Sequence, residues 1–350
     1  MPNVALDLRS DAVTRATDAM WDAMRASDGR ADAVAELEAA AAQLAGKPAA
    51  LYVPTGTIGN LAALMSHTHH GEQVVVEASC HIRWSEEWGF AAICGVALLP
   101  LAGWRGHIGA GDLEETFADA PFGHRPATTL VCIENAHNMA GGTVAPVADV
   151  MRLRDVAHRH GARVHLDGAR VLNACAALAV EPADMLAAVD SCTLNLNKGL
   201  SAPQGAVLVG SRDLVAAARS NVRRLGAHRI AQDASQAAAG LVGLRTMVPQ
   251  LAEDNRRARC LAELLAGIEG VRVDVQAVET NIVMADTTAL GVTAVELTHW
   301  LAARGAHSLP YTRDVTRFVT HRHISDGTVR RTAELVAELA ATRRGVRVHA

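Results

Sequence analysis

The sequence predicts an α/β protein whose larger domain is built on a mainly parallel, mixed sheet of seven strands, followed by a smaller α+β domain. Short apolar runs of strand length alternate with longer stretches of helical periodicity, which is typical of strands joined by crossover helices. Hydrophobic residues make up 50% of the 350 residues and charged residues only 20%, so the chain has the composition of a folded protein. At this length we expect one large domain and a smaller one.

Local patterns predict the elements of the larger domain in order. The alanine-rich stretch 31–46 fits an amphipathic helix because Leu37, Leu44 and its charges follow a helical period. The same periodicity predicts helices at 57–69 and 147–160 and mostly helical structure over 211–265. The strands, each a short apolar run, are predicted at 50–54, 73–77, 95–99, 128–133, 163–167, 190–195 and 205–209.

The C-terminal part of the chain has shorter strand-like runs, which predict the smaller α+β domain. These runs lie at 271–276, 279–285 and 316–320, and helical patterns separate them at 293–304 and 327–342. We therefore expect three parts: an N-terminal segment (1–20) that contributes to an active site, a large domain (21–248) and a small domain (249–350).

The composition argues against several classes of function. The net charge is −4 and no basic run is present, which is unfavourable for nucleic-acid binding. No apolar stretch reaches the ~18 residues that suggest a membrane helix, and the first residues do not resemble a signal peptide. The six cysteines form no CxxC pair, which favours buried thiols in a reducing cytoplasm over disulfides or a metal site. We expect a cytoplasmic protein.

Lysine is scarce, and this scarcity draws attention to Lys198. Among the 33 Lys and Arg residues only Lys47 and Lys198 are lysines. Arginine replaces a solvated lysine at little cost, but it cannot replace a lysine whose neutral amine does chemistry. Lys198 directly follows the strand predicted at 190–195, where a partly buried amine can act as a Schiff-base nucleophile; the alternative is a surface lysine at a strand end. Lys47 is expected to be a cation at a helix C-terminus.

Three further segments place polar residues at the ends of predicted strands. Asp167 closes the strand at 163–167, and Arg170 follows it; together they fit a pyridine-nitrogen partner and a carboxylate clamp, or a structural Asp–Arg pair. Gly56 and Thr57 lie where a strand runs into a helix, which suits a phosphate or an ordinary Thr-capped helix. His81 follows the strand at 73–77, although a lone histidine is more often structural.

Each of these segments alone has a structural explanation, but their combination indicates a cofactor site. A phosphate cradle, an aspartate and a lysine, in this chain order at successive strand ends, are the parts that hold pyridoxal 5′-phosphate. This cofactor acts as an electron sink for carbanions at the substrate Cα. The sequence therefore predicts an enzyme that acts on an amino acid.

At these positions the sequence resembles the pyridoxal-phosphate-dependent L-threonine aldolases, which have fold type I and belong to the β-eliminating lyase superfamily. The resemblance spans most of the chain, and HLDGAR at 165–170 is identical to the family's motif. The segments that are similar lie at 6–14, 52–60, 77–82, 132–138, 165–170, 197–200, 280–283 and 317–321.

The resemblance implies roles for particular residues. Lys198 would carry the cofactor as a Schiff base, Asp167 would pair with the pyridinium and His81 would stack on the ring. Gly56 and Thr57 would bind the phosphate. The amino-acid carboxylate would be held by Ser10, Arg170 and Arg317, and His124 would be a candidate base near the substrate hydroxyl, as would His81.

The sequence departs from the family pattern in two places. A tyrosine-bearing segment of relatives is replaced by the shorter 28–34, which affects the expected substrate preference. The family's glycine-rich GGGMRQ is replaced by 226–232, where Arg229 is a candidate phosphate or interface residue.

The resemblance implies reversible retro-aldol cleavage of L-threonine, L-allo-threonine or a related β-hydroxy-α-amino acid to glycine and an aldehyde. Two alternatives stay open. One is another pyridoxal-phosphate reaction, such as β-elimination, racemisation or transfer of the glycine unit. The other is a degenerate, non-catalytic module of the same fold. Relatives place the active site at a subunit interface, so a homodimer or homotetramer is expected.

Overall fold

The computed structural model describes residues 6–27, 32–119, 126–227 and 230–347. The chain divides into two compact units. The larger unit comprises Arg15–Ala140 and Val144–Val248, and the smaller comprises Met1–Thr14, Gly141–Thr143 and Pro249–Ala350. The smaller unit thus combines segments from both ends of the chain.

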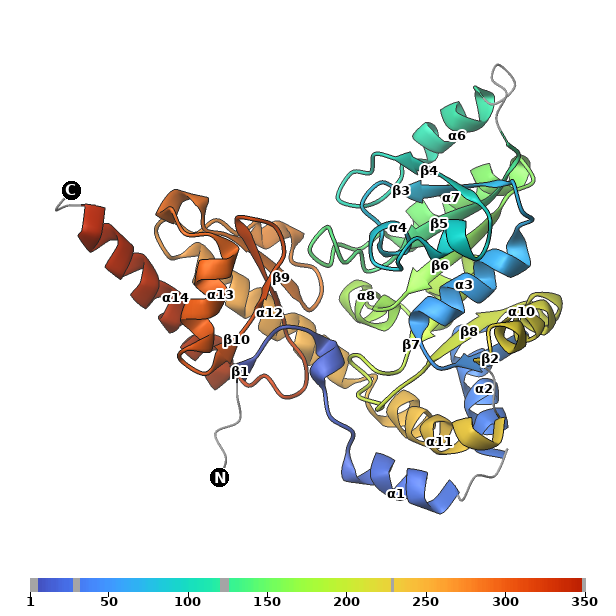
Figure 1. The fold of residues 1–350 in the computed structure, drawn as a ribbon, viewed down its shortest axis with the longest axis horizontal. Coiled ribbons are helices and arrows are strands. Elements are labelled where there is room, and N and C mark those ends of the chain that lie inside the picture. Colours follow the sequence, from blue (N-terminus) through green and yellow to red (C-terminus); the bar gives the residue numbers. More distant parts are fainter. Residues whose placement is uncertain (1–5, 28–31, 120–125, 228–229, 348–350) are drawn as a thin grey trace. The chain divides into compact units, whose positions relative to one another are not determined.

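A seven-stranded sheet forms the centre of the larger unit (Figure 1). Its strands lie in the order β2 (Ala49–Val53), β8 (Ala206–Gly210), β7 (Ser191–Asn195), β6 (Arg163–Gly168), β5 (Thr128–Glu134), β3 (Gln73–Glu77) and β4 (Ala97–Leu101). Only β8 runs antiparallel to its neighbours β2 and β7, and the other pairs are parallel. The predicted mainly parallel, mixed sheet is confirmed, and all seven strands lie within two residues of their predicted bounds.

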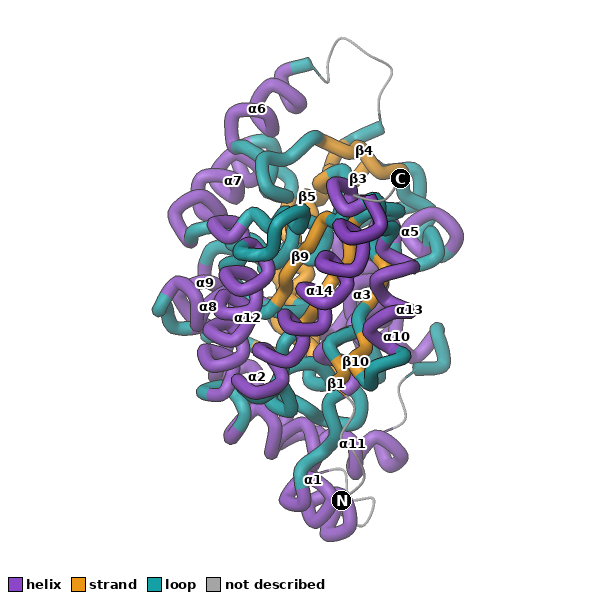
Figure 2. Tube along the Cα trace, turned by 90° about the vertical axis from the view of Figure 1, so that its left-hand side faces the viewer, coloured by secondary structure: helices purple, strands orange, loops and turns teal. Residues whose placement is uncertain are grey.

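Helices cover both faces of this sheet (Figure 2). The helices of the larger unit are α1 (Asp18–Ser27), α2 (Asp32–Ala45), α3 (Gly56–His67), α4 (His81–Trp84), α5 (Gly89–Ala92), α6 (Ala110–Ala118), α7 (Val147–Arg159), α8 (Val171–Leu178), α9 (Pro182–Ala187), α10 (Arg212–Arg224) and α11 (Ile230–Thr246). On one face, Leu130 and Cys132 of β5 pack in a cluster with Leu61 and Leu64 of helix α3. On the opposite face, Ile133 of β5 lies near Val150 and Leu153 of helix α7.

Helix α3 lies close against the sheet, and its sequence explains why. Thr55 caps the helix, because its Oγ1 accepts a hydrogen bond from the N–H of Ile58 at 3.2 Å. Gly59 faces Thr193 of β7, and a Cβ atom at this glycine would lie only 2.7 Å from Thr193 Cγ2. Because Gly59 has no side chain, α3 can approach β7 closely at this point. The next residue, the polar Asn60, is therefore buried between the helix and the sheet.

The smaller unit has two short sheets of its own. β1 (Leu6–Asp7) pairs in parallel with β10 (Ala306–His307), and the antiparallel sheet has the order β11 (Leu309–Pro310), β12 (Val315–Val319), β9 (Ile282–Asp286). Leu8, Leu261 and Phe318 belong to its core. Its helices are α12 (Gln250–Ala266), α13 (Ala294–Ala302) and α14 (Asp326–Arg347), with 3₁₀ turns at Asp11–Val13, Val275–Ala277 and Thr288–Leu290.

One predicted strand of this unit is wrong. Within 271–276 only Arg272 forms a bridge, with Asp286, and the chain then turns into a 3₁₀ helix. The cause is Asp274, whose Oδ1 accepts hydrogen bonds from the N–H groups of Gln276 and Ala277. A side chain that bonds to its own backbone competes with the strand ladder.

In the part of the chain that the structure describes, no helix has both the length and the apolar character needed to cross a bilayer.

Candidate active site

A hollow of about 200 Å³ opens in the larger unit where strands β6 and β7 end and helix α3 begins. The two strands are parallel neighbours, so their carboxyl ends meet at one edge of the sheet, where α/β folds bind ligands. Five of the sequence-predicted residues line the hollow. The full lining consists of Thr55, Gly56, Thr57, Asn60, His81, Glu86, Asp167, Ala169, Asn195, Asn197 and Lys198.

The start of α3 forms the part of the hollow suited to an anion. Gly56 is the first helical residue, and the N–H groups of a first turn have no partner within the helix. A Cβ atom on Gly56 would lie 2.5 Å from Asn195 Oδ1, so the main chain approaches this side chain as closely as glycine permits. Asn195 in turn donates to Asn197 Oδ1 at 3.2 Å. Backbone and amide donors together fit a phosphate group.

Asp167 is the buried acid of the hollow. The residue is 3% exposed, Oδ1 accepts from the N–H of Ala169 at 3.1 Å and Oδ2 accepts from Asn60 Nδ2 at 3.0 Å. Burial by itself raises the pKa of the Asp167 carboxyl, but the positive charges of His81 and Lys198 outweigh it and lower this pKa. Asp167 is therefore a carboxylate near neutral pH, as a partner for a pyridinium must be.

His81 begins α4 and is tied to the hollow from two directions. Its backbone N–H donates to Glu134 Oε2 at 2.9 Å, and its ring Nδ1 lies 3.2 Å from Glu86 Oε1 and 3.8 Å from Asp167 Oδ2. Burial favours the neutral ring, yet the hydrogen bond with Glu86 and the charge of Asp167 raise the pKa of His81.

Besides Thr55 and Ala169, four lining residues were not among the predicted site residues. Glu86 is buried and shares Asn60 with Asp167, because Asn60 Nδ2 also donates to Glu86 Oε1 at 2.8 Å. Burial raises the pKa of Glu86, and the neighbouring groups do not outweigh this effect as they do at Asp167. The other two residues, Asn195 and Asn197, carry a readable signal, since alternate positions at a strand end point to one side. Neither Asn60 nor Glu86 has such a signal.

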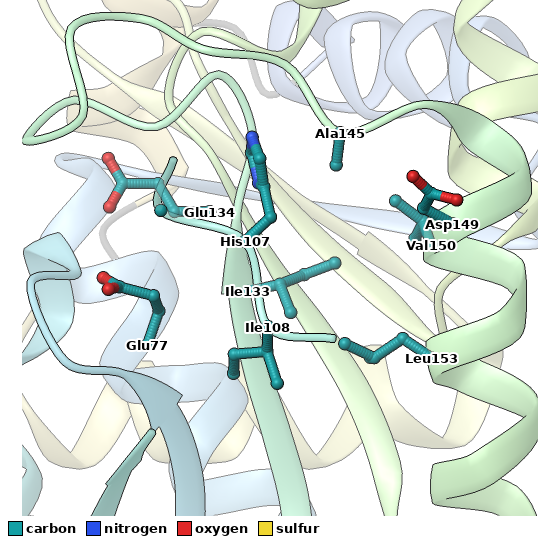
Figure 3. A pocket seen from close by; sticks show the side chains of 10 residues that line it. Glu77, His107, Ile108, Ile133, Glu134, Ala145, Asp149, Val150 and Leu153 are labelled. Atoms are coloured by element: carbon teal, nitrogen blue, oxygen red, sulfur yellow. The ribbon is translucent and has the colours of Figure 1, made fainter. Parts of the chain in front are cut away.

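A second pocket is lined by the ends of β3 and β5 and by helix α7. Its volume is about 30 Å³, which is the size of a single water molecule and too small for an amino acid. Figure 3 shows Glu77 and Glu134 on one side of this pocket and Val150 and Leu153 of α7 on the other. Glu77 Oε2 lies 3.0 Å from His137 Nε2, so these carboxylates hold the surrounding loops together.

The remaining predicted residues fall into three groups. Arg170, also in the larger unit, is buried and its Nη1 donates to Asn138 Oδ1 at 3.3 Å. Ser10 and Arg317 belong to the smaller unit. There, Ser10 Oγ accepts from the N–H of Ala12, and Arg317 Nη2 donates to the carbonyl of Arg9. The third group, His124 and Arg229, lies outside the described residues, as do residues 28–31 of the divergent segment.

Lys47 lies outside the hollow and follows the C-terminus of α2. Its Nζ donates to the carbonyl oxygen of Val189 at 2.6 Å, and burial lowers its pKa. This contact links the helix end to the bend that precedes β7, so Lys47 has a structural partner that the sequence did not reveal.

Known proteins share this fold and much of this sequence. The family model of the β-eliminating lyases matches residues 7–288. Low-specificity L-threonine aldolase 1 of Arabidopsis thaliana is 37% identical over 337 residues, which cover 93% of each chain. Low specificity L-threonine aldolase of Escherichia coli K12 is 32% identical over 345 residues, 96% of this chain and 97% of the relative. The solved threonine aldolase of Leishmania major has a TM-score of 0.82 at 18% identity, over 95% of this chain and 99% of that one.

The fold and the site define a class, the pyridoxal 5′-phosphate-dependent lyases of fold type I. The match over most of the chain identifies its family: the protein belongs to the β-eliminating lyases, and the resemblance found in its motifs is confirmed.

Proposed function

We propose that this protein cleaves L-threonine, L-allo-threonine or a related β-hydroxy-α-amino acid reversibly to glycine and an aldehyde. The observation that carries this proposal is the gathering of Lys198, Asp167 and His81 around one hollow beside the N-terminus of α3. The relatives named above support the choice of reaction, because each carries the name threonine aldolase.

The residues of the hollow fit pyridoxal 5′-phosphate by charge and by donor type. The first turn of α3, with Gly56 and Thr57, suits the phosphate, and ionised Asp167 suits the pyridinium nitrogen. Lys198 is the amine that would hold the cofactor covalently. When bound there, the cofactor supplies an electron sink for the electron pair of a bond broken at Cα.

The protein's own groups provide binding and proton transfer. Arg170 presents a guanidinium, whose planar fork suits a substrate carboxylate. His81 and His124 are the candidate bases for the β-hydroxyl proton, directly or through a water. In the neutral form of His81, a proton held on Nδ1 by Glu86 leaves Nε2 as the atom that can accept the hydroxyl proton. The roles of Ser10, Arg317 and Arg229 remain predictions from the family resemblance.

Product analysis tests the reaction. The purified protein with added pyridoxal 5′-phosphate is incubated with L-threonine, L-allo-threonine and a panel of bulkier, including aryl, β-hydroxy amino acids. We expect glycine and the matching aldehyde in equal amounts, and no product from the Lys198→Ala variant. Formation of 2-oxobutanoate or D-threonine alone would replace this proposal by elimination or racemisation. A wild-type protein that neither binds the cofactor nor reacts would indicate a non-catalytic module.

We also propose that the protein is a cytoplasmic homodimer or homotetramer. Trp84 and Trp88, next to the hollow, are 55% and 56% exposed, and exposed aromatic side chains of this size favour a subunit interface. Five of the six cysteines are buried as free thiols, which suits a reducing compartment. Light scattering after size-exclusion chromatography measures the subunit number, and a monomer at working concentration would contradict the proposed assembly.

A further inference from the structure

A row of polar side chains is enclosed between α3 and the sheet, behind the hollow. Asn60 and His67 lie seven residues apart on α3 and therefore point to the same side of the helix, two turns apart. On β6, His165 and Asp167 alternate and therefore share one face of the sheet. Ser191 of β7 is the register partner of His165. The helical repeat of α3 and the alternation of side chains along the strands therefore place these five side chains in one row.

Consecutive members of the row are within hydrogen-bond distance. His67 Nε2 lies 2.8 Å from Ser191 Oγ, and Ser191 Oγ lies 2.9 Å from His165 Nδ1. His165 Nε2 lies 3.2 Å from Asn60 Oδ1, and Asn60 Nδ2 lies 3.0 Å from Asp167 Oδ2. The row is a continuous chain that ends on the carboxylate of the candidate site.

The donor and the acceptor of each hydrogen bond in the row can be assigned in turn, starting from Asp167. Asn60 Nδ2 lies against two carboxyl groups, those of Asp167 and Glu86, so its two hydrogens are directed there and Oδ1 faces His165. His165 must then carry its hydrogen on Nε2. A neutral imidazole has one N–H, so its Nδ1 accepts from the Ser191 hydroxyl, whose oxygen accepts from His67 Nε2.

The electrostatics of the two rings agree with this assignment. Burial lowers the pKa of His165 to about 3 and that of His67 to about 4, so both rings are neutral near pH 7. Asp167 then receives a neutral N–H donor from Asn60. A reversed amide would instead place Oδ1 against two carboxyl groups, which is repulsive.

We propose that Asn60, kept in one orientation by His165 and Ser191, is the positioning residue that keeps the Asp167 carboxylate aligned to receive the pyridinium of the cofactor. This inference rests on the proposed function. A donor to the charged form of a carboxyl favours that form, and a carboxylate held in one rotamer is ready for its partner. The alternative is that the row only fastens α3 to the sheet.

Nitrogen-15 NMR of the cofactor-free protein tests the direction of the row without any reaction. With labelled histidine, His165 is expected in the Nε2–H tautomer at neutral pH, and the signal is assigned by its loss in His165→Gln. A charged ring, or hydrogen on Nδ1, would overturn the inference.

Cofactor affinity tests the consequence for Asp167. Equilibrium dialysis measures the dissociation constant of pyridoxal 5′-phosphate for the wild type and for variants. Asn60→Asp keeps the shape but replaces the donor by an acceptor, and we expect it to weaken binding about 10- to 100-fold. His165→Leu removes the bond to Asn60 Oδ1 and weakens binding as well, whereas His165→Gln, which retains an amide donor, recovers most of it.

Thr193→Val is the matched control. Thr193 lies buried on β7, two residues from Ser191, but its hydroxyl is among the buried atoms with no hydrogen-bond partner in the described structure. This variant should bind the cofactor as tightly as the wild type. Equal weakening in Thr193→Val, or wild-type affinity in both Asn60→Asp and His165→Leu, would assign the row a purely structural role.

Thermal unfolding of each cofactor-free variant separates a positioning role from loss of fold. If Asn60→Asp does not fold, the comparison of His165→Leu with His165→Gln decides. If the wild type and the variants bind the cofactor equally well, the positioning role of Asn60 is contradicted and the proposed function is not. A wild type that binds no cofactor contradicts the proposed function instead, and the NMR result still decides the direction of the row.

Discussion

The side-chain nitrogen of Asn60 lies 3.0 Å from Oδ2 of Asp167, although 107 residues separate the two along the chain. The first belongs to the helix that begins the hollow, and the second closes a central strand. Asn60 is in turn bonded to His165, which does not line the hollow. The geometry of the candidate site therefore also depends on residues outside its lining.

Covalent attachment is expected at Lys198 alone. Borohydride reduction of the cofactor-loaded protein should fix the cofactor on the Lys198 peptide, because only this lysine lines the hollow. Mass spectrometry of a digest checks the assignment. Lys47→Arg is the control and should label like the wild type, since Lys47 Nζ is bonded to Val189. Label on Lys47 would contradict the proposed site.

Gly56→Ala should weaken cofactor binding about tenfold, which corresponds to ~1.4 kcal/mol. The new Cβ would lie 2.5 Å from Asn195 Oδ1 and would displace a side chain of the hollow. Equilibrium dialysis measures the effect. Gly111→Ala is the control, because nothing lies within 4 Å of its Cβ position in α6. It should leave binding unchanged and stabilise the helix by about 0.5–1 kcal/mol. Unaltered binding in Gly56→Ala would argue against a phosphate at this helix terminus.

Arg170→Lys is expected to lower kcat/KM about 10- to 100-fold, mainly through a higher KM. A lysine retains the charge but loses the planar fork that holds a carboxylate by two bonds. Steady-state kinetics with L-threonine measure the change. The exposed Arg152, which pairs with Asp149 on the surface of α7, provides the matched substitution, and Arg152→Lys should have no effect. Unchanged kinetics in Arg170→Lys would exclude this residue as the carboxylate ligand.

Glu86→Gln should lower the pKa of His81. In the wild type the hydrogen bond to Glu86 helps raise this pKa against the effect of burial. An uncharged amide removes that contribution. NMR titration of His81 in the cofactor-free protein measures the shift. Glu87→Gln, at the exposed neighbouring position, should leave the titration of His81 unchanged. An equal pKa in wild type and Glu86→Gln would show that Glu86 does not control His81.

His165 should contribute to the loss of stability in acid. Burial lowers its pKa in the folded protein to about 3, whereas an unperturbed histidine has a pKa of 6.5. Below pH 6.5 the unfolded chain therefore binds a proton that the folded protein refuses, and stability falls as the pH falls towards 3. Urea unfolding at several pH values should give a shallower acid slope for His165→Gln than for the wild type. Parallel slopes would mean that His165 is not buried in its neutral form.

The strands of the large sheet were predictable because each is a short apolar run between polar turns. Burial on both faces produces this pattern in the central strands, whereas the edge strand β4 has no buried residue. The segment 271–276 alternates valine with polar residues, which is also typical of a strand, but Asp274 bonds to its own backbone and forms a turn. The hydrophobic pattern alone does not show that the side chain of Asp274 competes with strand pairing.

Among the candidate site residues, those at strand ends were predictable. Parallel strands bring their carboxyl ends to one edge, so the sequence alone predicts that Asp167 and Lys198 are neighbours. Asn60 is different, because it lies within an apolar helix and its partners come from distant segments. Although Asn60 ends the segment 52–60 that resembles the family, the local sequence does not show that its side chain faces Asp167.

The sequence by itself determined the α/β fold, the family and the residue types of the candidate site, because these depend on local periodicity and on short motifs. Only the tertiary structure decided which polar groups face one another in the buried layer. It directs Asn60 towards Asp167 and surrounds His165 with protein, which keeps its ring neutral. Hydrogen-bond direction and pKa depend on distances between groups far apart in the chain, and these distances exist only after folding.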